Sequence, residues 1–241
     1  MSALSIAMLA AGHTAASAQA PAPAPAAPAT QAAAAAGSAT APTATTAQPP
    51  ASAKPAKARV RLTVTRKRLN VRAGNRARVA GRLSQAGAGR TVTLERLGAR
   101  GWRTIDRART SRSGRFTVSY RAKDVDTARV RVRFAGDRTA RPARRTLGRL
   151  NVFRPALASW YGPGLYGNHL SCGGTLTPGT IGVAHKTLPC GTDLVLRKGN
   201  RIVHAQVIDR GPYVGAREFD LTAATKYRLG FGSTGTVLVA H

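Results

Sequence analysis

The sequence predicts an all-β protein with two folded parts, preceded by an apolar leader and a low-complexity stretch. Apolar residues alternate with polar ones over residues 58–153, which is the period of a half-buried strand. Residues 154–241 contain further short apolar runs separated by glycines, and only residues 221–229 follow a helical period. Short strands at regular spacing with turn signals between them are typical of β-sandwiches and small barrels.

The first twenty residues resemble an export signal. A short apolar run covers residues 3–11 and is too short to span a bilayer. Ala18-Gln19-Ala20 fits the small-x-small pattern that precedes a cleavage site. We therefore expect a signal peptide over residues 1–20 and a product that is secreted to the cell wall or the extracellular space, with no membrane span.

Residues 21–57 are almost entirely Ala, Pro, Thr, Ser and Gln. Such a composition offers too little apolar surface to offset the entropy of ordering the chain. We expect this segment to be a disordered linker between the leader and the first folded part.

Residues 58–153 predict an immunoglobulin-like antiparallel β-sandwich. Val60, Leu62 and Val64 alternate with Arg59 and Arg61. The same alternation recurs further along the segment, and clusters rich in Gly, Ser and Ala separate the repeats. About seven short strands at a spacing of roughly ten residues favour a sandwich.

This segment also carries most of the positive charge. Of a formal net charge of +29, residues 58–153 contribute +22. Arg129, Arg131 and Arg133 are expected to line one strand face, where they can bind anionic polymers of a cell wall or nucleic acid. The export signal argues against nucleic acid, and the few aromatic residues alternate like core positions. A solvated basic face without a ligand is the alternative.

Residues 154–241 predict a small closed barrel with one helix. Strands are expected at 156–161, 182–187, 192–198, 201–208 and 234–240. The helix at 221–229 is expected to have Asp220 as its N-cap and Gly230 just beyond its end. Several short strands with one helix suit a closed barrel.

Cys172 and Cys190 are the only cysteines of the chain, and an even count in an exported protein favours a disulfide. An alternative is a catalytic thiol with His185 as its base. Zinc is disfavoured because the paired ligand spacing is missing. No metal or other cofactor is predicted.

Four acidic residues lie in the last 88 residues: Asp193, Asp209, Glu218 and Asp220. Three of them fall between residues 207 and 222, on either side of a Gly211-Pro212 turn. This concentration indicates a site with acid/base chemistry. The alternative is structural, with Asp209 bracing the turn and Asp220 capping the helix.

Several motifs of the C-terminal part resemble the rare-lipoprotein-A (RlpA-like) double-psi β-barrel family. They occur in order over about 85 residues as Ala158-Ser159-Trp160-Tyr161-Gly162, Ala184-His185-Lys186-Thr187, Asp209-Arg210-Gly211-Pro212-Tyr213 and Phe219-Asp220-Leu221-Thr222. The resemblance implies a six-stranded barrel. Some members of the family are lytic transglycosylases that act on peptidoglycan, and the related expansins loosen walls without clear hydrolysis.

The resemblance carries catalytic roles onto Asp209, Asp220 and His185. Trp160, Tyr161 and Tyr213 can stack on sugar rings; Trp160 has the alternative of filling the barrel, and His185 that of a hydrogen-bonded barrel residue. The transglycosylases of the family carry a glutamate eleven residues before the histidine, and here that position is Gly174.

Two functions follow as expectations. One is a lytic transglycosylase-like enzyme that cleaves peptidoglycan glycan strands. The other is a non-catalytic, expansin-like wall-binding or wall-loosening module, in which the basic sandwich holds anionic wall polymers.

Overall fold

The computed structural model describes residues 56–85 and 87–241. The predicted signal peptide and nearly all of the predicted linker lie outside these residues. Strands make up most of the described chain, with one short helix, so the all-β prediction is confirmed. Within the described ranges, no helix has the length and apolar character needed to cross a membrane.

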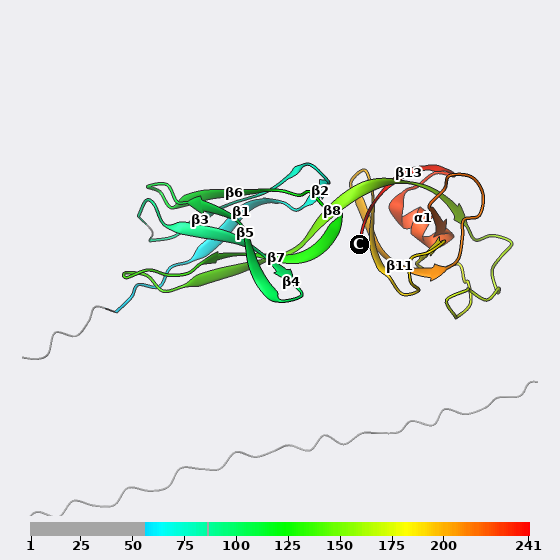
Figure 1. Cartoon of the computed structure of the whole chain (residues 1–241), viewed down its shortest axis with the longest axis horizontal. Helices are drawn as coiled ribbons and strands as arrows, with labels where there is room; N and C mark the ends of the chain where they lie inside the picture. Colours follow the sequence, from blue (N-terminus) through cyan, green and yellow to red (C-terminus); the bar gives the residue numbers. More distant parts are fainter. Residues whose placement is uncertain (1–55, 86) are drawn as a thin grey trace, which may run out of the picture. The chain divides into compact units, whose positions relative to one another are not determined.

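Two sheets form the N-terminal part (Figure 1). The first is antiparallel and has the order β1-β3-β6, with bounds Leu62–Arg68, Arg76–Leu83 and Arg115–Arg121. The second joins β5, β4, β7 and the first half of β8, with bounds Gly101–Arg109, Thr91–Gly98, Asp126–Phe134 and Ala143–Tyr161. The short strand β2 (Asn70–Arg72) pairs with β8 in parallel.

Strand alternation builds a single core between these two sheets. Val79 and Val118 of the first sheet and Val92 and Val132 of the second are fully buried and belong to one cluster. Burying each such side chain stabilises the fold by roughly 1.5–3 kcal/mol. Two sheets around one core agree with the predicted sandwich, and its immunoglobulin-like character stays a prediction.

One turn of this part requires glycine. Gly114 has a φ of +76°, and a Cβ at this position would lie 2.2 Å from the backbone oxygen of Leu83. The close approach allows the Gly114 oxygen to accept the N–H of Leu83, which connects the end of β3 to the turn before β6.

The C-terminal part is a closed six-stranded barrel, as predicted. The strand order is β12-β9-β11-β10-β13-β8, and parallel pairing between β12 and β8 closes the ring. The bounds are Val183–His185 for β9, Asp193–Lys198 for β10, Arg201–Asp209 for β11, Phe219–Thr222 for β12 and Gly235–Ala240 for β13. The barrel interior is filled by apolar side chains such as Phe219, Leu221 and Val207.

The helix α1 (Ala223–Leu229) begins two residues later than the sequence predicts. Its N-cap is Thr222, whose hydroxyl accepts the N–H of Thr225. The predicted cap, Asp220, is wrong: it lies within β12, because pairing of β12 with β8 keeps residues 219–222 extended. The predicted end is confirmed, since Gly230 adopts the left-handed conformation that closes many helices.

Strand β8 belongs to both parts of the chain. Its pairing with β7 ends at Val152 and its pairing with β2 ends at Phe153. Its pairing with β13 begins at Arg154. The predicted boundary between residues 153 and 154 therefore coincides with a change of strand partners but not with a break in the strand, and independent folding of the two parts stays a prediction.

Cys172 and Cys190 form a disulfide, as predicted, with their Cα atoms 5.5 Å apart. The bond links the long loop after β8 to the turn before β10. In the chain-entropy account, a disulfide that closes a loop of this length stabilises the folded protein by about 3 kcal/mol, because it restricts the unfolded chain. With both sulfur atoms bonded to each other, neither is a free thiol nucleophile.

Candidate active site

Asp209 and Asp220 lie on the two strands that flank β9. Ala184 of β9 is the register partner of Asp209 on one side and of Asp220 on the other. Neighbouring strands are about 4.8 Å apart, so the two Asp backbones are about two strand spacings apart across a small, buried alanine. Both carboxylates are partly exposed. The barrel thus brings together two acids that are eleven residues apart in the sequence.

The environment of Asp220 raises the pKa of its carboxyl group. Burial raises its pKa most strongly, and the charge of Asp209 raises it further. A hydrogen bond from Ser159 and the charge of Arg217 oppose this rise without cancelling it. The Ser159 hydroxyl lies 2.5 Å from Oδ1 of Asp220 and donates to it, which leaves Oδ2 for a ligand.

Asp209 is held by backbone donors. Its Oδ1 accepts the N–H groups of Ser171 and Arg210, each at 2.9 Å. Ser171 belongs to the loop that the disulfide fixes, because Cys172 is the next residue. These two donors fix the position of Oδ1.

Tyr161 contributes a buried hydroxyl to the same place. Among the described residues its oxygen has no hydrogen-bond partner. Burial is the main cause that raises its pKa, and the charge of Asp209, its closeness as a hydrogen-bond acceptor and the charge of Asp220 add to the rise. The hydroxyl is thus near Asp209 without forming a hydrogen bond of normal geometry. The hydroxyl therefore stays protonated beside the two acids. Tyr161 was predicted as a sugar-stacking residue, but the hydroxyl is its chemically distinctive group here.

His185 is oriented differently from the two acids. His185 is the register partner of Phe219, the residue before Asp220. Because neighbouring residues of a strand point to opposite faces, the His185 side chain lies on the face opposite to that of Asp220. Its ring packs on Phe219 with the centroids 4.8 Å apart. Nδ1 accepts the N–H groups of Thr187 at 3.1 Å and Leu188 at 2.9 Å. The ring is 8% exposed, and this placement favours the alternative of a hydrogen-bonded barrel residue.

The electrostatic environment of His185 is consistent with a neutral, hydrogen-bonded barrel residue. Burial lowers its pKa, although the nearby Glu218 works in the opposite direction. The neutral ring then carries its proton on Nε2, because Nδ1 accepts two hydrogen bonds. Nε2 lies 3.6 Å from Oε1 of Glu218.

Glu218 forms a paired group that the sequence did not reveal. Both of its oxygens accept from the guanidinium of Arg154, one of them at 2.7 Å. The hydrogen bonding to Arg154 is the main cause that lowers the pKa of Glu218. Glu218 therefore stays ionised and does not supply a proton. Its partner lies 64 positions away in the chain, so no local pattern could have revealed the pair.

Arg210 ties the loops around the site together. Its guanidinium donates to the backbone oxygens of His185 at 3.2 Å and Leu188 at 2.7 Å. It also lies 3.2 Å from the sulfur of Cys190. The arginine that follows Asp209 thus has a structural role, because it holds the segment from His185 to Cys190 beside the end of β11.

The other two predicted sugar-binding residues differ in placement. Trp160 pairs with the buried Leu221 and packs against the barrel core, on the face opposite to Asp220. Lys226 Nζ lies 3.5 Å from its ring centroid. Trp160 therefore fits its alternative role in packing. Tyr213 is 78% exposed on the loop between the two acids and is available to contact a ligand.

The loop at Gly174 has a conformation suited to glycine. Gly173 and Gly174 have φ values of +95° and +80°, and a side chain at position 174 would meet open space. Non-glycine residues rarely adopt such angles, at a cost of about 1–2 kcal/mol. A glutamate at position 174 would therefore be strained in this loop.

Comparisons with known proteins agree with the barrel and its motifs. The family model described as "Lytic transglycolase" matches residues 156–241. A probable endolytic peptidoglycan transglycosylase RlpA from Synechocystis is 36% identical over 113 residues, covering 42% of this chain and 35% of that protein. The endolytic peptidoglycan transglycosylase RlpA of Campylobacter jejuni is 40% identical over 85 residues, covering 34% of this chain and 31% of that protein.

The fold and the site define the C-terminal part as a double-psi β-barrel. The matching family model and relatives make it, more specifically, an RlpA-like double-psi β-barrel. A third relative, from Pseudomonas aeruginosa, is 36% identical over 84 residues, covering 34% of this chain and 25% of that protein. The chain spans about a third or less of the length of these relatives.

Proposed function

We propose that the barrel binds the glycan strands of peptidoglycan and cleaves them by lytic transglycosylation, with Asp220 as the acid and base. The observation that carries this proposal is the partly buried Asp220, whose pKa is raised beside a second carboxylate. The names of the relatives describe the same reaction on peptidoglycan. The apolar leader predicts that the protein is exported, which would bring the barrel to its peptidoglycan substrate.

The proposed reaction needs one carboxyl group for proton transfer. Asp220 gives its proton to the glycosidic oxygen as the bond from that oxygen to the anomeric carbon breaks. Asp209, as a carboxylate, stabilises the positive charge on the sugar ring. The 6-hydroxyl of the same sugar then attacks the anomeric carbon and returns its proton to Asp220. The product is a 1,6-anhydro sugar, and no water molecule is activated.

The other groups support these steps. Ser159 holds Oδ1 of Asp220 and leaves Oδ2 for the proton transfer. The buried hydroxyl of Tyr161 lies beside both acids and helps to keep Asp209 in position. The exposed Tyr213 lies on the loop between the acids and gives a surface on which a sugar ring can stack.

A second candidate function is supported by Gly174. Without the family glutamate, the barrel keeps two acids that bind glycan but lacks a third carboxylate from the Gly174 loop. This arrangement favours an expansin-like module that binds or loosens the wall without turnover.

Incubation of the protein with purified peptidoglycan, followed by mass analysis of the soluble products, separates the two candidates. Release of 1,6-anhydro-muropeptides supports the transglycosylase. Binding to peptidoglycan without any released product supports the non-catalytic module. Absence of both binding and cleavage would rule out both functions.

A further inference from the structure

Arginines lie directly opposite arginines across the three-stranded sheet. The register pairs Arg68 with Arg78 between β1 and β3. It also pairs Arg76 with Arg121, and Arg82 with Arg115, between β3 and β6. Like charges at directly opposite positions destabilise a sheet. Three such pairs in one small sheet are a cost to folding that a bound anion would relieve.

These arginines share one surface, the outer face of the sheet. Ala77, Val79 and Val118 point inward and are fully buried, so the residues between them point outward. We call this surface the arginine face and define it by its exposed basic residues, Arg66, Arg68, Arg76, Arg78, Arg82, Arg115 and Arg121. The outward positions of β1, β3 and β6 hold no acidic and no aromatic residue.

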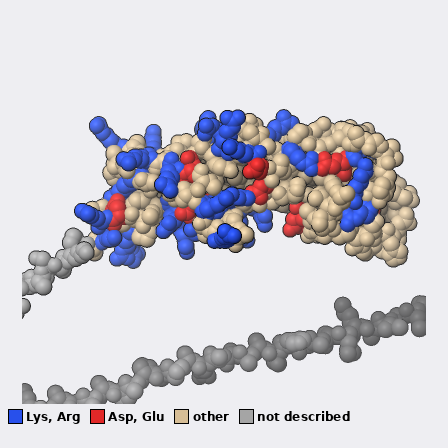
Figure 2. Space-filling view, viewed as in Figure 1, with Lys and Arg blue, Asp and Glu red and all other residues tan. Residues whose placement is uncertain are grey.

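The second sheet also places arginines opposite arginines, at Arg96 and Arg103, Arg129 and Arg149, and Arg133 and Arg144. It differs from the first sheet in supplying acidic partners to some of its arginines. Glu95 lies 2.6 Å from Arg131 and 3.6 Å from Arg133, and Asp126 pairs with Arg96. None of the ion pairs in the described part of the chain includes a residue of the arginine face. Residues 1–57 contain no Asp or Glu, so the undescribed N-terminal residues carry no carboxylate side chain for it. Figure 2 shows how Lys and Arg crowd the part of the chain that precedes the barrel.

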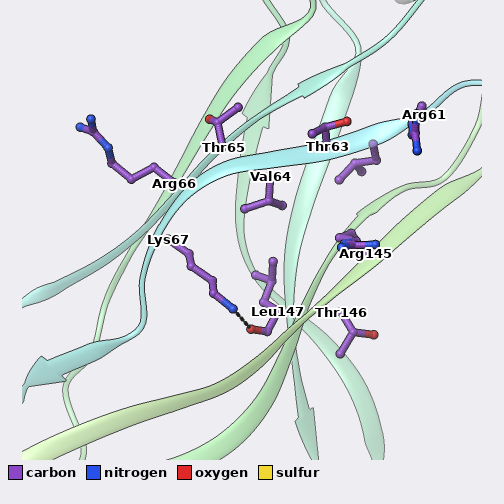
Figure 3. A pocket seen from close by; sticks show the side chains of 10 residues that line it. Arg61, Thr63, Val64, Thr65, Arg66, Lys67, Arg145, Thr146 and Leu147 are labelled. Carbon is purple, nitrogen blue, oxygen red and sulfur yellow. Dashed lines mark hydrogen bonds between the residues drawn. The ribbon is translucent and has the colours of Figure 1, made fainter. Parts of the chain in front are cut away.

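Two of the hollows that include residues of strand β1 also include arginines of the arginine face. Arg68, Arg76, Arg78 and Arg121 line one of them, together with the turn at Gly74 and Asn75. The other lies between β1 and β8, with basic residues at its rim and Leu62, Val64 and Leu147 at its floor. Figure 3 shows Lys67 reaching across it to the backbone oxygen of Leu147, at 2.8 Å, while Arg66 extends away from Leu147.

The second hollow offers hydrogen-bond donors as well as charge. β1 is an edge strand of its sheet, and β8 between Ala143 and Leu147 has a strand partner on one side only. Backbone N–H groups and the hydroxyls of Thr63 and Thr146 therefore accompany the charges of Arg61 and Arg145. Guanidinium groups, hydroxyls and backbone N–H groups are the donors that phosphate oxygens accept in proteins.

We propose that the arginine face and the adjoining hollow bind an extended phosphodiester polymer through its phosphate groups, with glycerol phosphate repeats as the polymer chemistry. The absence of aromatic side chains from the face removes the stacking by which proteins hold nucleotide bases or sugar rings. The polymer is therefore bound by its charges. The choice of a wall polymer over nucleic acid rests on the proposed function at peptidoglycan, but the binding itself does not require an active barrel.

The test uses the full chain and two triple variants with the same change of charge. The first is Arg68→Gln, Arg78→Gln and Arg121→Gln, on the arginine face. The matched control is Arg129→Gln, Arg144→Gln and Arg149→Gln, which are exposed residues of β7 and β8 without an acidic partner. These residues also lie opposite arginines but line neither hollow, so the control separates like-charge pairing from the proposed site. Affinity for a glycerol phosphate polymer is measured across salt concentrations, with polyglutamate and a single-stranded DNA oligonucleotide as comparison ligands.

We expect the parent to bind the glycerol phosphate polymer with an affinity that falls steeply with salt. The face variant should lose about 2 from the slope of log affinity against log salt, since each lost phosphate contact removes about 0.7. At 0.15 M salt this corresponds to an affinity roughly 50-fold weaker. The control variant should bind within about threefold of the parent, because its arginines make no phosphate contact.

Three results would overturn the proposal. Equal losses in both variants would mean that net charge alone attracts the polymer. Equal or tighter binding of polyglutamate would exclude recognition of phosphate. Tighter binding of DNA than of glycerol phosphate polymer would assign the face to nucleic acid.

A second measurement keeps the test valid if the face variant does not fold. Phenylglyoxal modifies accessible arginines of the parent protein, and mass analysis locates the modified residues. With glycerol phosphate polymer bound, Arg78 and Arg121 should be protected while Arg129 and Arg149 react as before. Uniform protection, or none, would contradict a localised site. Failure of this test leaves the peptidoglycan activity untouched, because that activity is read from the sugar products.

Discussion

The hydroxyl of Ser159 donates a hydrogen bond to Oδ1 of Asp220 at 2.5 Å, across the parallel pair that closes the barrel. Because the donor favours the ionised carboxylate, it lowers the pKa of Asp220 against the larger effect of burial. The pairing of β8 with β12 therefore both closes the barrel and places the hydroxyl that lowers the pKa of Asp220.

Replacing Ser159 by Ala should raise the pKa of Asp220 further. In the proposed mechanism activity declines at alkaline pH as Asp220 loses its proton, so this limb of the pH–activity profile should move to higher pH in Ser159→Ala. Carbon-13 NMR titration of the Asp220 carboxyl reads the same shift directly. Ser113→Ala, in an exposed turn, is the control and should leave both measurements unchanged. An unshifted Asp220 titration in Ser159→Ala would contradict the account.

Two substitutions of Asp209 should separate its charge from its bracing role. Asp209→Asn keeps an oxygen that accepts from Ser171 and Arg210, so stability should be nearly unchanged while activity is lost. Since the Asp209 charge raises the pKa of Asp220, that pKa should also fall in this variant. Asp209→Ala leaves the two N–H groups without their acceptor and should lose about 1–3 kcal/mol of unfolding free energy. Denaturant unfolding and peptidoglycan cleavage measure the two effects. Full activity in Asp209→Asn would make this carboxylate purely structural.

Reduction of the disulfide should affect both stability and the site. The intact mass of the native protein should be lower by two hydrogens than that of the reduced form. Reduction should lower the unfolding free energy by about 3 kcal/mol, because the unfolded chain gains freedom. The loop that holds Asp209 also loosens, so cleavage should slow before the protein unfolds. Two thiols that react with iodoacetamide in the native protein would refute the pairing.

A fragment of residues 154–241 should fold on its own, because all six barrel strands keep their pairings from Arg154 onward. A fragment of residues 153–241 should be the more stable of the two. It retains Phe153, which is fully buried in the whole chain and packs with Val195 and Ala240. Thermal unfolding under oxidising conditions compares them. A non-cooperative transition in both fragments would show that the two parts fold only together.

Local patterns were sufficient for most of the strands and for the end of the helix, but they missed β12. Alternation of apolar residues identifies core positions such as Val92 and Val132, and Gly230 marks the helix end through its left-handed conformation. The helix start was wrong because Asp220 is a good cap by residue type, while pairing with a strand about 60 residues earlier fixes it in β12. Propensity cannot report such distant pairing.

In the site, too, some features follow from local motifs and others depend on distant strand pairing. Family motifs indicated Asp209 and Asp220, and the barrel brings them together around Ala184. The orientation of Trp160 and His185 away from the acids depends on strand register, and the pairing of Glu218 with Arg154 depends on closure of the barrel. Neither register nor closure can be derived from spacing along the sequence.

Substitution of Asp220 by Asn tests the central claim most directly. Asn still accepts the hydrogen bond from Ser159, and the change removes only the charge and the transferable proton. Because the pKa of Asp220 is raised in the folded protein, its ionised form weakens stability as pH rises through that pKa. At neutral pH the variant should therefore be as stable as the parent or slightly more so.

The deciding measurement is the release of 1,6-anhydro-muropeptides from peptidoglycan by the parent, Asp220→Asn and Asp193→Asn. Asp193 is exposed and lies outside the site, so Asp193→Asn should match the parent. We predict no anhydro product from folded Asp220→Asn. Product release by Asp220→Asn at the rate of the parent would contradict the assignment of Asp220 as the acid and base.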